Sequence, residues 1–318
     1  MGGTCCKKGE EKKTVAEADT QTEKNDEEGN LVQSDKENKE NNEKNETKLM
    51  PYQIHLENYL DPTIDDTDVF DREWYNDMEK DKIIYSKRSI IAMQKKAFDE
   101  NNNSDYKEIY SKHPLFISVK SSGSFINSNF QITKNLYIAD KSLFPKNTSL
   151  KMIAKYMLNV KERSSWDQQL KSYKVIEGNE EGQEIKCILH NWLKSPMFLV
   201  SERDIVEKRY DFYYNGSYYN YESSVNDKFL PPEEGVTRIF DIISLQEIHD
   251  EGDNFVFRTI TQMDAKVSLP QSLINTTLSG KLKNFYEGII KAMNNDYEKG
   301  QLVFVDNDGN EISKTNEE

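Results

Sequence analysis

The sequence predicts a mixed α+β domain in which helices cover the apolar face of an antiparallel sheet. Three observations lead to this expectation: a helical pattern occurs early, short alternating segments fill the middle, and a long amphipathic pattern follows near the end. With 36% hydrophobic and 11% aromatic residues, the chain has enough apolar side chains for a sizeable core.

The first 49 residues contain no aromatic residue and are rich in Lys, Glu, Asn, Asp and Thr. Such a segment buries too little apolar surface to offset its ordering entropy, so residues 1–49 are expected to be a disordered tether. Residues 50–107 form an N-terminal extension. Within it, IIYSKRSIIAMQKKAF has apolar residues at helical spacing, which predicts a helix near residues 79–99.

The middle of the chain reads as a series of strands that one helix interrupts. TSLKMIAKYMLNV predicts that helix, with Thr148 or Ser149 as its N-cap. The dipeptide Asn215–Gly216 lies between two tyrosine-rich runs and predicts a two-residue hairpin. The segments that alternate like strands are HPLFISVKSSG, SFINSNFQI, KNLYIAD, YKVIEG, EIKCILHNW, RDIVEKRYDFYY, SYYNYESSV, VTRIFDIISLQEI and NFVFRTITQM.

The last long element is an amphipathic helix. It begins at Pro270, a residue that the first turn of a helix tolerates. Its apolar positions recur every three or four residues, at Ile274, Leu278, Leu282, Phe285, Ile289 and Met293. Residues 298–318 form a C-terminal tail, in which VDNDGNE is expected to make a hairpin turn because it lacks the glutamate that a calcium loop requires.

Composition excludes several classes of function. A formal net charge of −14 argues against a general nucleic-acid binder, because such proteins need a basic face. The chain has no apolar run long enough for a membrane span and no apolar block of the signal-peptide kind after its start. Three cysteines do not make a disulfide framework. A cytosolic, reducing environment is expected.

The sequence offers no catalytic constellation, and no cofactor or metal is expected. Its four histidines lie on different elements without an i, i+4 partner, so each is expected to have a structural role. No glycine-rich phosphate-binding motif occurs. Cys187 lies in an alternating strand with apolar neighbours and is expected to be a small core residue.

Four linked motifs carry a family resemblance. RSSWDQQLKSYKVIEG, SPMFLVSERDIVEKR, EEGVTRIFDIISLQEI and TQMDAKVSLPQSLINTTLSGKLKNFYEGIIKAM follow one another in the order and spacing of a START domain, the steroidogenic-acute-regulatory-related lipid-transfer module. The resemblance covers residues 108–297. It implies a helix-grip fold, in which a curved antiparallel sheet wraps around a long C-terminal helix and encloses an apolar tunnel for one lipid.

The ligand implied by this resemblance is a phospholipid, a sterol or a similar lipid. Candidate lipid contacts on and before the last helix are Leu269, Leu273, Ile274, Leu278 and Phe285, and Trp192 is a candidate on the sheet. Core and tunnel walls share the same composition, so these positions fit either role. The family's Gly and Trp before Leu269 are replaced by Val267 and Ser268.

Arg209 matches a cavity arginine of some family members, where it pairs with an acid on the preceding strand. His190 stands at the corresponding acid position of this chain, and both residues are candidate lipid contacts. An alternative is that Arg209 is a surface strand cation, because a charged residue is seldom buried without a partner.

The chain begins MGGTCCKKGE, which resembles an acylation site. Myristoylation would attach to Gly2, and Cys5 and Cys6 would accept palmitate, although position six usually holds Ser or Thr. Two lipid signals are needed for stable anchoring. The tether would then give the domain a reach of about 40 Å from the bilayer. The alternative is an unmodified N-terminus.

These features predict a non-enzymatic protein that binds and transfers one lipid while it is tethered to the cytosolic face of a membrane. A membrane-tethered adaptor or ligand-sensing module with the same fold is the alternative. A third reading is an enzyme of the wider helix-grip group, such as a cyclase or a hydrolase, for which no nucleophile and base are evident.

Overall fold

The computed structural model describes residues 86–99, 105–120, 131–195, 200–225, 230–264 and 270–312, together with Thr63 and Lys266. The described residues belong to one compact unit, Lys48–Glu318. The predicted tether and its acylation site lie outside the described residues.

An antiparallel sheet forms the centre of the described part of the chain. Its strands follow the order β1-β2-β3-β10-β9-β7-β6-β5-β4, and the short β8 pairs with β6 in parallel. The bounds are β1 Lys107–Lys112, β2 Leu115–Lys120, β3 Ile132–Asp140, β4 Leu170–Gly178, β5 Ile185–Leu193, β6 Arg203–Tyr214, β7 Ser217–Ser224, β8 Thr237–Arg238, β9 Phe240–Glu251 and β10 Asn254–Asp264.

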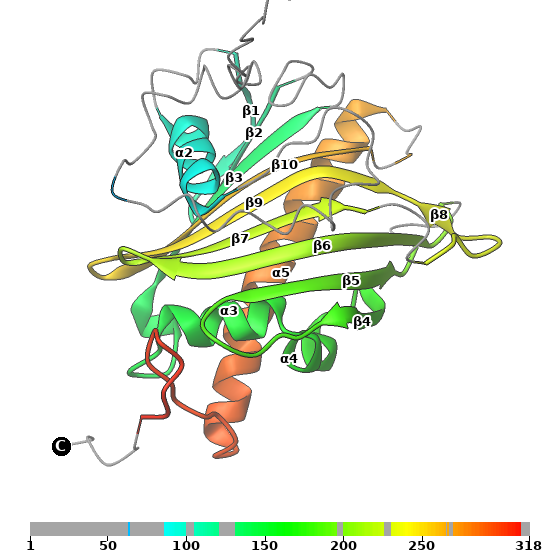
Figure 1. The fold of residues 1–318 in the computed structure, drawn as a ribbon. Helices are drawn as coiled ribbons and strands as arrows, with labels where there is room; N and C mark the ends of the chain where they lie inside the picture. The colour runs from blue at the N-terminus through cyan, green and yellow to red at the C-terminus, as the bar shows by residue number, and fades with distance from the viewer. Residues whose placement is uncertain are drawn as a thin grey trace, which may run out of the picture. The chain divides into compact units, whose positions relative to one another are not determined.

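Helices cover both faces of this curved sheet, as Figure 1 shows. Helix α2 (Lys87–Phe98) lies on one face, called here the outer face. Helices α3 (Leu150–Leu158), α4 (Val160–Trp166) and α5 (Gln271–Glu298) lie on the opposite, inner face. The predicted curved antiparallel sheet with a long C-terminal helix is confirmed.

The outer face is held by an apolar contact between α2 and the central strands. Ile90 and Ile91 of α2 are buried in a cluster with Phe212, Tyr221 and other aromatic or branched residues of the sheet. The tyrosine-rich hairpin predicted at Asn215–Gly216 supplies part of this cluster from β6 and β7. Burial of these large side chains is the main force that keeps α2 on the sheet.

The inner face carries the larger core. Tyr137, Phe257 and Ile248 of the sheet pack with α3 and with the C-terminal half of α5, including Ile289 and Met293. A short 3₁₀ turn, Lys141–Leu143, precedes α3. Cys187 is free and fully buried within the sheet, as expected of a small core residue.

The residues after α5 fold back as a hairpin, called here the C-terminal clasp (residues 301–312). Leu302 and Phe304 are buried against the inner core. The Asn307 side-chain oxygen accepts a hydrogen bond from the Leu150 amide at the start of α3, at 3.0 Å. The predicted turn in VDNDGNE lies at the tip of this hairpin, where Val305 and Glu311 form an isolated bridge.

Two local details differ from the sequence-based expectation. The predicted single helix TSLKMIAKYMLNV ends at Leu158, because Asn159 adopts an extended conformation and caps the next helix, α4, through the Lys161 amide. The strand β1 was not predicted. Most of the predicted strand SFINSNFQI falls outside the described residues.

Helix α5 packs unevenly along its length. In its described N-terminal half no side chain is fully buried, and the first buried residue is Tyr286. Toward the C-terminus, Gly288 allows a close approach to α4, since a Cβ there would lie 2.8 Å from the Trp166 ring. Of the helices in the described residues, none combines the length and the hydrophobicity needed to cross a membrane.

Candidate functional site

Two rows of polar side chains cross the inner face of the sheet, side by side. Because paired residues of neighbouring strands share a face, the strand register shows which side chains lie together. The rows run through β3, β10, β9, β7 and β6. The first row is Asn135, Thr259, Gln246, Asn220 and Asp211, and the second is Thr133, Thr261, Ser244, Glu222 and Arg209.

Helix α5 crosses this polar surface with an apolar stripe. Leu278, Leu282 and Phe285 are partly buried and contact the inner core. At the edge of the stripe, the Tyr286 hydroxyl donates to the Asn135 side-chain oxygen at 2.6 Å and lies 3.4 Å from the Thr259 hydroxyl. An apolar helix stripe therefore passes over a wall that consists of hydroxyl, amide and charged groups.

Four members of the two rows are incompletely covered. Thr133, Gln246, Thr259 and Thr261 keep partial exposure, although they lie in the middle strands of the sheet. Polar groups that are buried need hydrogen-bond partners, and groups that remain solvated do not. The arrangement suits an amphiphilic ligand whose polar groups meet the rows and whose apolar part meets α5.

Arg209 is the centre of a buried ionic network at one end of the rows. Its side chain is 1% exposed, and its Nε donates to both carboxylate oxygens of Asp211, at 2.9 and 2.8 Å. Its Nη1 donates to Glu180 Oε1 at 2.8 Å and to the Leu158 carbonyl at 2.5 Å. The alternative of a surface strand cation is wrong, because the guanidinium is buried and paired.

Further donors complete the coordination of the Asp211 carboxylate. The Tyr218 hydroxyl donates to Oδ2 at 3.1 Å, and the Asn220 amide donates to Oδ1 at 2.7 Å. Buried carboxylates require such partners, since transfer of an unpaired charge from water is costly. The network therefore fixes Arg209 between the sheet and the β4–β5 connection, which carries Glu180.

Burial also shifts the titration of the acids beside Arg209. It raises the pKa of Glu222, an effect that the Arg209 and Arg163 charges oppose. Burial likewise raises the pKa of Glu180, and Arg209 again opposes the change. Arg163 is held by Asp167, at 3.1 Å, and lies over the Phe285 ring at 5.5 Å. Arg163 therefore links the end of the rows that carries Glu222 to the apolar stripe of α5.

The structure places His190 and Trp192 away from this site. In the register of β5 and β6, both residues face the outer side of the sheet, opposite to Arg209. The His190 Nε2 lies 3.1 Å from Asp204, which also binds Arg238. The expected alignment of His190 with Arg209 is therefore not seen. Cys187 is the residue of β5 paired with Arg209, whereas His190 is paired with Val206, and its side chain lies on the opposite face.

The candidates on α5 divide into two groups. Leu278 and Phe285 contact the inner core, and Ile274 is partly buried. Leu273 is 43% exposed. Leu269 lies outside the described residues. The structure therefore brings Leu278 and Phe285 to the same inner side as Arg209, whereas Leu273 remains at the surface.

Sequence reasoning missed most of the polar rows. Hairpin pairing outward from Asn215–Gly216 places Arg209 opposite Glu222 and Asp211 opposite Asn220. That signal was present in the sequence once the turn had been recognised. The members on β3, β9 and β10 had no comparable local signal.

The described residues contain no group of three or more His, Cys, Asp or Glu side chains arranged to hold a metal ion. The site can supply hydrogen bonds, charge and apolar contact. It consists of the apolar stripe of α5 and the two polar rows, in which Arg209 is neutralised by Asp211 and Glu180.

Comparisons with known proteins agree with this architecture. The chain aligns with human StAR-related lipid transfer protein 5 at a TM-score of 0.53 and 16% identity, covering 65% of this chain and 96% of that one. For human STARD10 the TM-score is 0.55 and the identity 13%, covering 72% of this chain and 94% of that one. No curated protein matches by sequence. The family model of the START domain matches residues 99–299, so the chain belongs to the START domain family.

Proposed function

We propose that the domain binds one amphiphilic lipid between the apolar stripe of α5 and the two polar rows, and transfers it between membranes. The observation that carries the proposal is the contrast between the partly buried Leu278, Leu282 and Phe285 and the polar wall that they cross. Membership in the START domain family supports it, and one similar structure is that of a lipid-transfer protein by its name.

The polar rows favour a lipid with hydrogen-bonding groups over a wholly apolar one. An apolar ligand would leave hydroxyl and amide groups such as those of Thr261 and Gln246 without partners, which costs free energy. Lipid entry is expected to involve the N-terminal half of α5, because the C-terminal half is held by Tyr286, Ile289 and Met293 in the core. The step is binding and release, with no covalent chemistry.

Native mass spectrometry of the full chain, after exposure to mixed phospholipid and sterol vesicles, tests this proposal. We expect one added lipid per chain, which exchanges with labelled vesicles. Leu282→Trp enlarges the side chain in the stripe and should reduce the loaded fraction. Val303→Trp is the matched control, since Val303 is 50% exposed in the C-terminal clasp. A folded chain that retains no lipid would favour an adaptor function instead.

We further propose that the N-terminus anchors the domain to the cytosolic face of a membrane. The support is the sequence alone: Gly2 follows the initiator methionine, and Cys5 and Cys6 are adjacent acceptors for a second acyl chain. Gly2→Ala and the pair Cys5→Ser with Cys6→Ser should each shift the protein to the soluble fraction. Unchanged membrane association in both variants would remove the anchor.

A further inference from the structure

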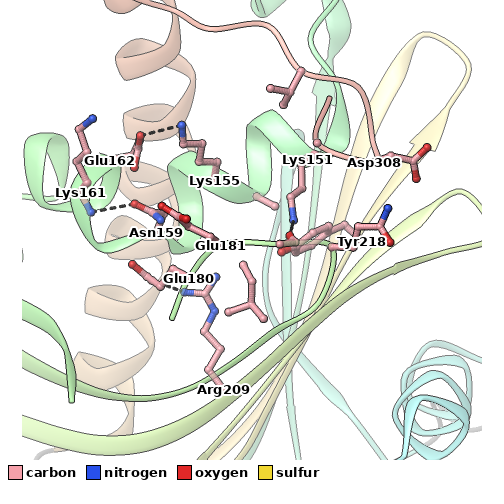
Figure 2. A pocket seen from close by; sticks show the side chains of 16 residues that line it. Lys151, Lys155, Asn159, Lys161, Glu162, Glu180, Glu181, Arg209, Tyr218 and Asp308 are labelled. Carbon is pink, nitrogen blue, oxygen red and sulfur yellow. Dashed lines mark hydrogen bonds and ion pairs between the residues drawn. The ribbon is translucent and has the colours of Figure 1, made fainter. Parts of the chain in front are cut away.

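A pocket lies at the Arg209 end of the polar rows, between α3, the β4–β5 connection and the C-terminal clasp (Figure 2). Its volume is about 430 Å³, which lies within the usual range for small-molecule sites. The lining includes Lys151, Glu181, Arg209, Tyr218 and Asp308 but no residue of α5. Arg209 is the one member of the polar rows in this lining.

One wall of this pocket comes from outside the segment that matches the family. The match ends at residue 299, and the C-terminal clasp that follows contributes Val305, Asp308 and Gly309 to the lining. The clasp is fixed in place by its buried Phe304 and by the hydrogen bond that Asn307 accepts from the Leu150 amide of α3. The pocket therefore depends in part on residues outside the matched segment.

The charges around the pocket balance in number. Four cationic residues and four anionic residues line it: Lys151, Lys155, Lys161 and Arg209, and Glu162, Glu180, Glu181 and Asp308. Some of them neutralise one another directly. Lys155 pairs with Glu162 at 3.1 Å, and Arg209 pairs with Glu180 at 2.8 Å. A ligand with only one sign of charge would therefore gain little net attraction.

Lys151 has no ion pair with any described residue. Its Nζ donates to the Gly182 carbonyl at 2.9 Å and lies 5.3 Å from the centre of the Tyr218 ring. Burial lowers its pKa, with Arg209 adding to the decrease and Asp211 opposing it. An ammonium group in this position has spare donors for an anionic group inside the pocket.

Glu181 is the complementary group. Its side chain is exposed at the pocket and takes part in no ion pair or hydrogen bond with the described residues. It belongs to the same connection as Gly182, which accepts the bond from Lys151. Lys151 and Glu181 therefore line the same pocket, near the β4–β5 connection, and do not pair with each other.

We propose that this pocket binds a small water-soluble zwitterion, a molecule with one phosphate or carboxylate and one ammonium group. The anionic group contacts Lys151, and the ammonium group contacts Glu181. Such a ligand matches the balanced charge of the walls and supplies each unpaired group with a partner. It also joins α3 to the β4–β5 connection, next to the Arg209 network.

Isothermal titration of the full chain with phosphoethanolamine tests the proposal, with inorganic phosphate and ethanolamine as singly functional probes. We expect one saturable site that binds phosphoethanolamine at least about tenfold more tightly than either control. Lys151→Met and Glu181→Gln should each weaken binding at least about fivefold. Lys291→Met removes an exposed lysine of α5 outside the lining and should leave binding unchanged.

Each outcome decides the matter. Glu181 is exposed, so its variant keeps the fold and remains informative even if Lys151→Met unfolds. Absence of saturable binding, or equal affinity in all variants, would overturn the proposal. A third titration uses dihexanoylphosphatidylethanolamine. If that lipid binds and free phosphoethanolamine does not, the pocket takes no soluble zwitterion and the inference fails. Loss of lipid loading in the vesicle experiment would leave this result unaffected.

Discussion

Replacing Arg209 by methionine should destabilise the domain strongly. Methionine keeps most of the length of the side chain but removes the donors to Asp211, Glu180 and the Leu158 carbonyl. Both carboxylates would then remain in a buried position without their cation. Breaking a buried ion pair in this way costs about 3–5 kcal/mol. The remaining donors to Asp211, from Tyr218 and Asn220, keep the cost from rising further.

Thermal and urea unfolding, followed by circular dichroism, measure this effect. A domain of about 150–250 residues loses about 2–4 °C of Tm per kcal/mol, so Tm should fall by about 6–20 °C. The control is Arg258→Met. Arg258 is partly exposed and pairs with Glu247 and Glu251 near the surface, so its loss should cost about 0–1 kcal/mol.

The pH dependence gives a second, independent check. Burial raises the pKa of Glu180 and the Arg209 charge opposes this change, so removing Arg209 raises the pKa of Glu180 further in the folded state. The folded variant then binds more protons than its unfolded chain, and its stability increases as pH falls. The difference in the free energy of unfolding between wild type and variant should therefore narrow from pH 7 to pH 5. A difference in the free energy of unfolding below about 1 kcal/mol at pH 7, or one that widens toward pH 5, would refute the stabilising role of the Arg209 network.

Three further predictions concern other parts of the fold. Gly288→Ala should destabilise the domain by roughly 1 kcal/mol, because the clash of the added Cβ with the Trp166 ring outweighs the gain in helix propensity. Gly280→Ala places its Cβ in open space and should stabilise the domain by about 0.5–1 kcal/mol. Urea unfolding measures both changes. Burial lowers the pKa of Lys134 to about 8, so the free energy of unfolding should rise as pH increases from about 8 to 10, and NMR titration of its side chain checks the pKa. Asn307→Ala removes the bond to the first amide of α3 and should cost about 1 kcal/mol by urea unfolding; no change would show that water replaces this bond.

Local sequence patterns were sufficient to predict most of the helices and strands. The spacing of apolar residues predicted α5, and the Asn215–Gly216 turn predicted the hairpin of β6 and β7. Helix α4 was not predicted; it begins directly after the predicted helix, where Asn159 both ends α3 and caps α4. Its seven residues, VKERSSW, are too short and too polar to give a helical pattern of apolar residues.

The candidate site was predictable only in part. Leu278 and Phe285 were found from helical spacing, and Arg209 from the family resemblance. His190 and Trp192 were named as candidate lipid contacts, but the register of β5 and β6 places them on the face opposite to Arg209, which the resemblance did not fix. A shift of one residue along a strand moves a side chain to the opposite face.

The sequence by itself determined the mixed α+β class, the long C-terminal helix and the START domain family, because periodicity and motif order are encoded locally along the chain. Only the tertiary structure decided the members of the polar rows on β3, β9 and β10, the contacts of Arg209 with Glu180 and Leu158, and the pocket beneath the C-terminal clasp. Each of these joins residues far apart in sequence, such as Asn135 with Thr259 or Lys151 with Gly182. Their meeting depends on strand order and on helix docking, which follow from the burial of the whole core and not from any single segment.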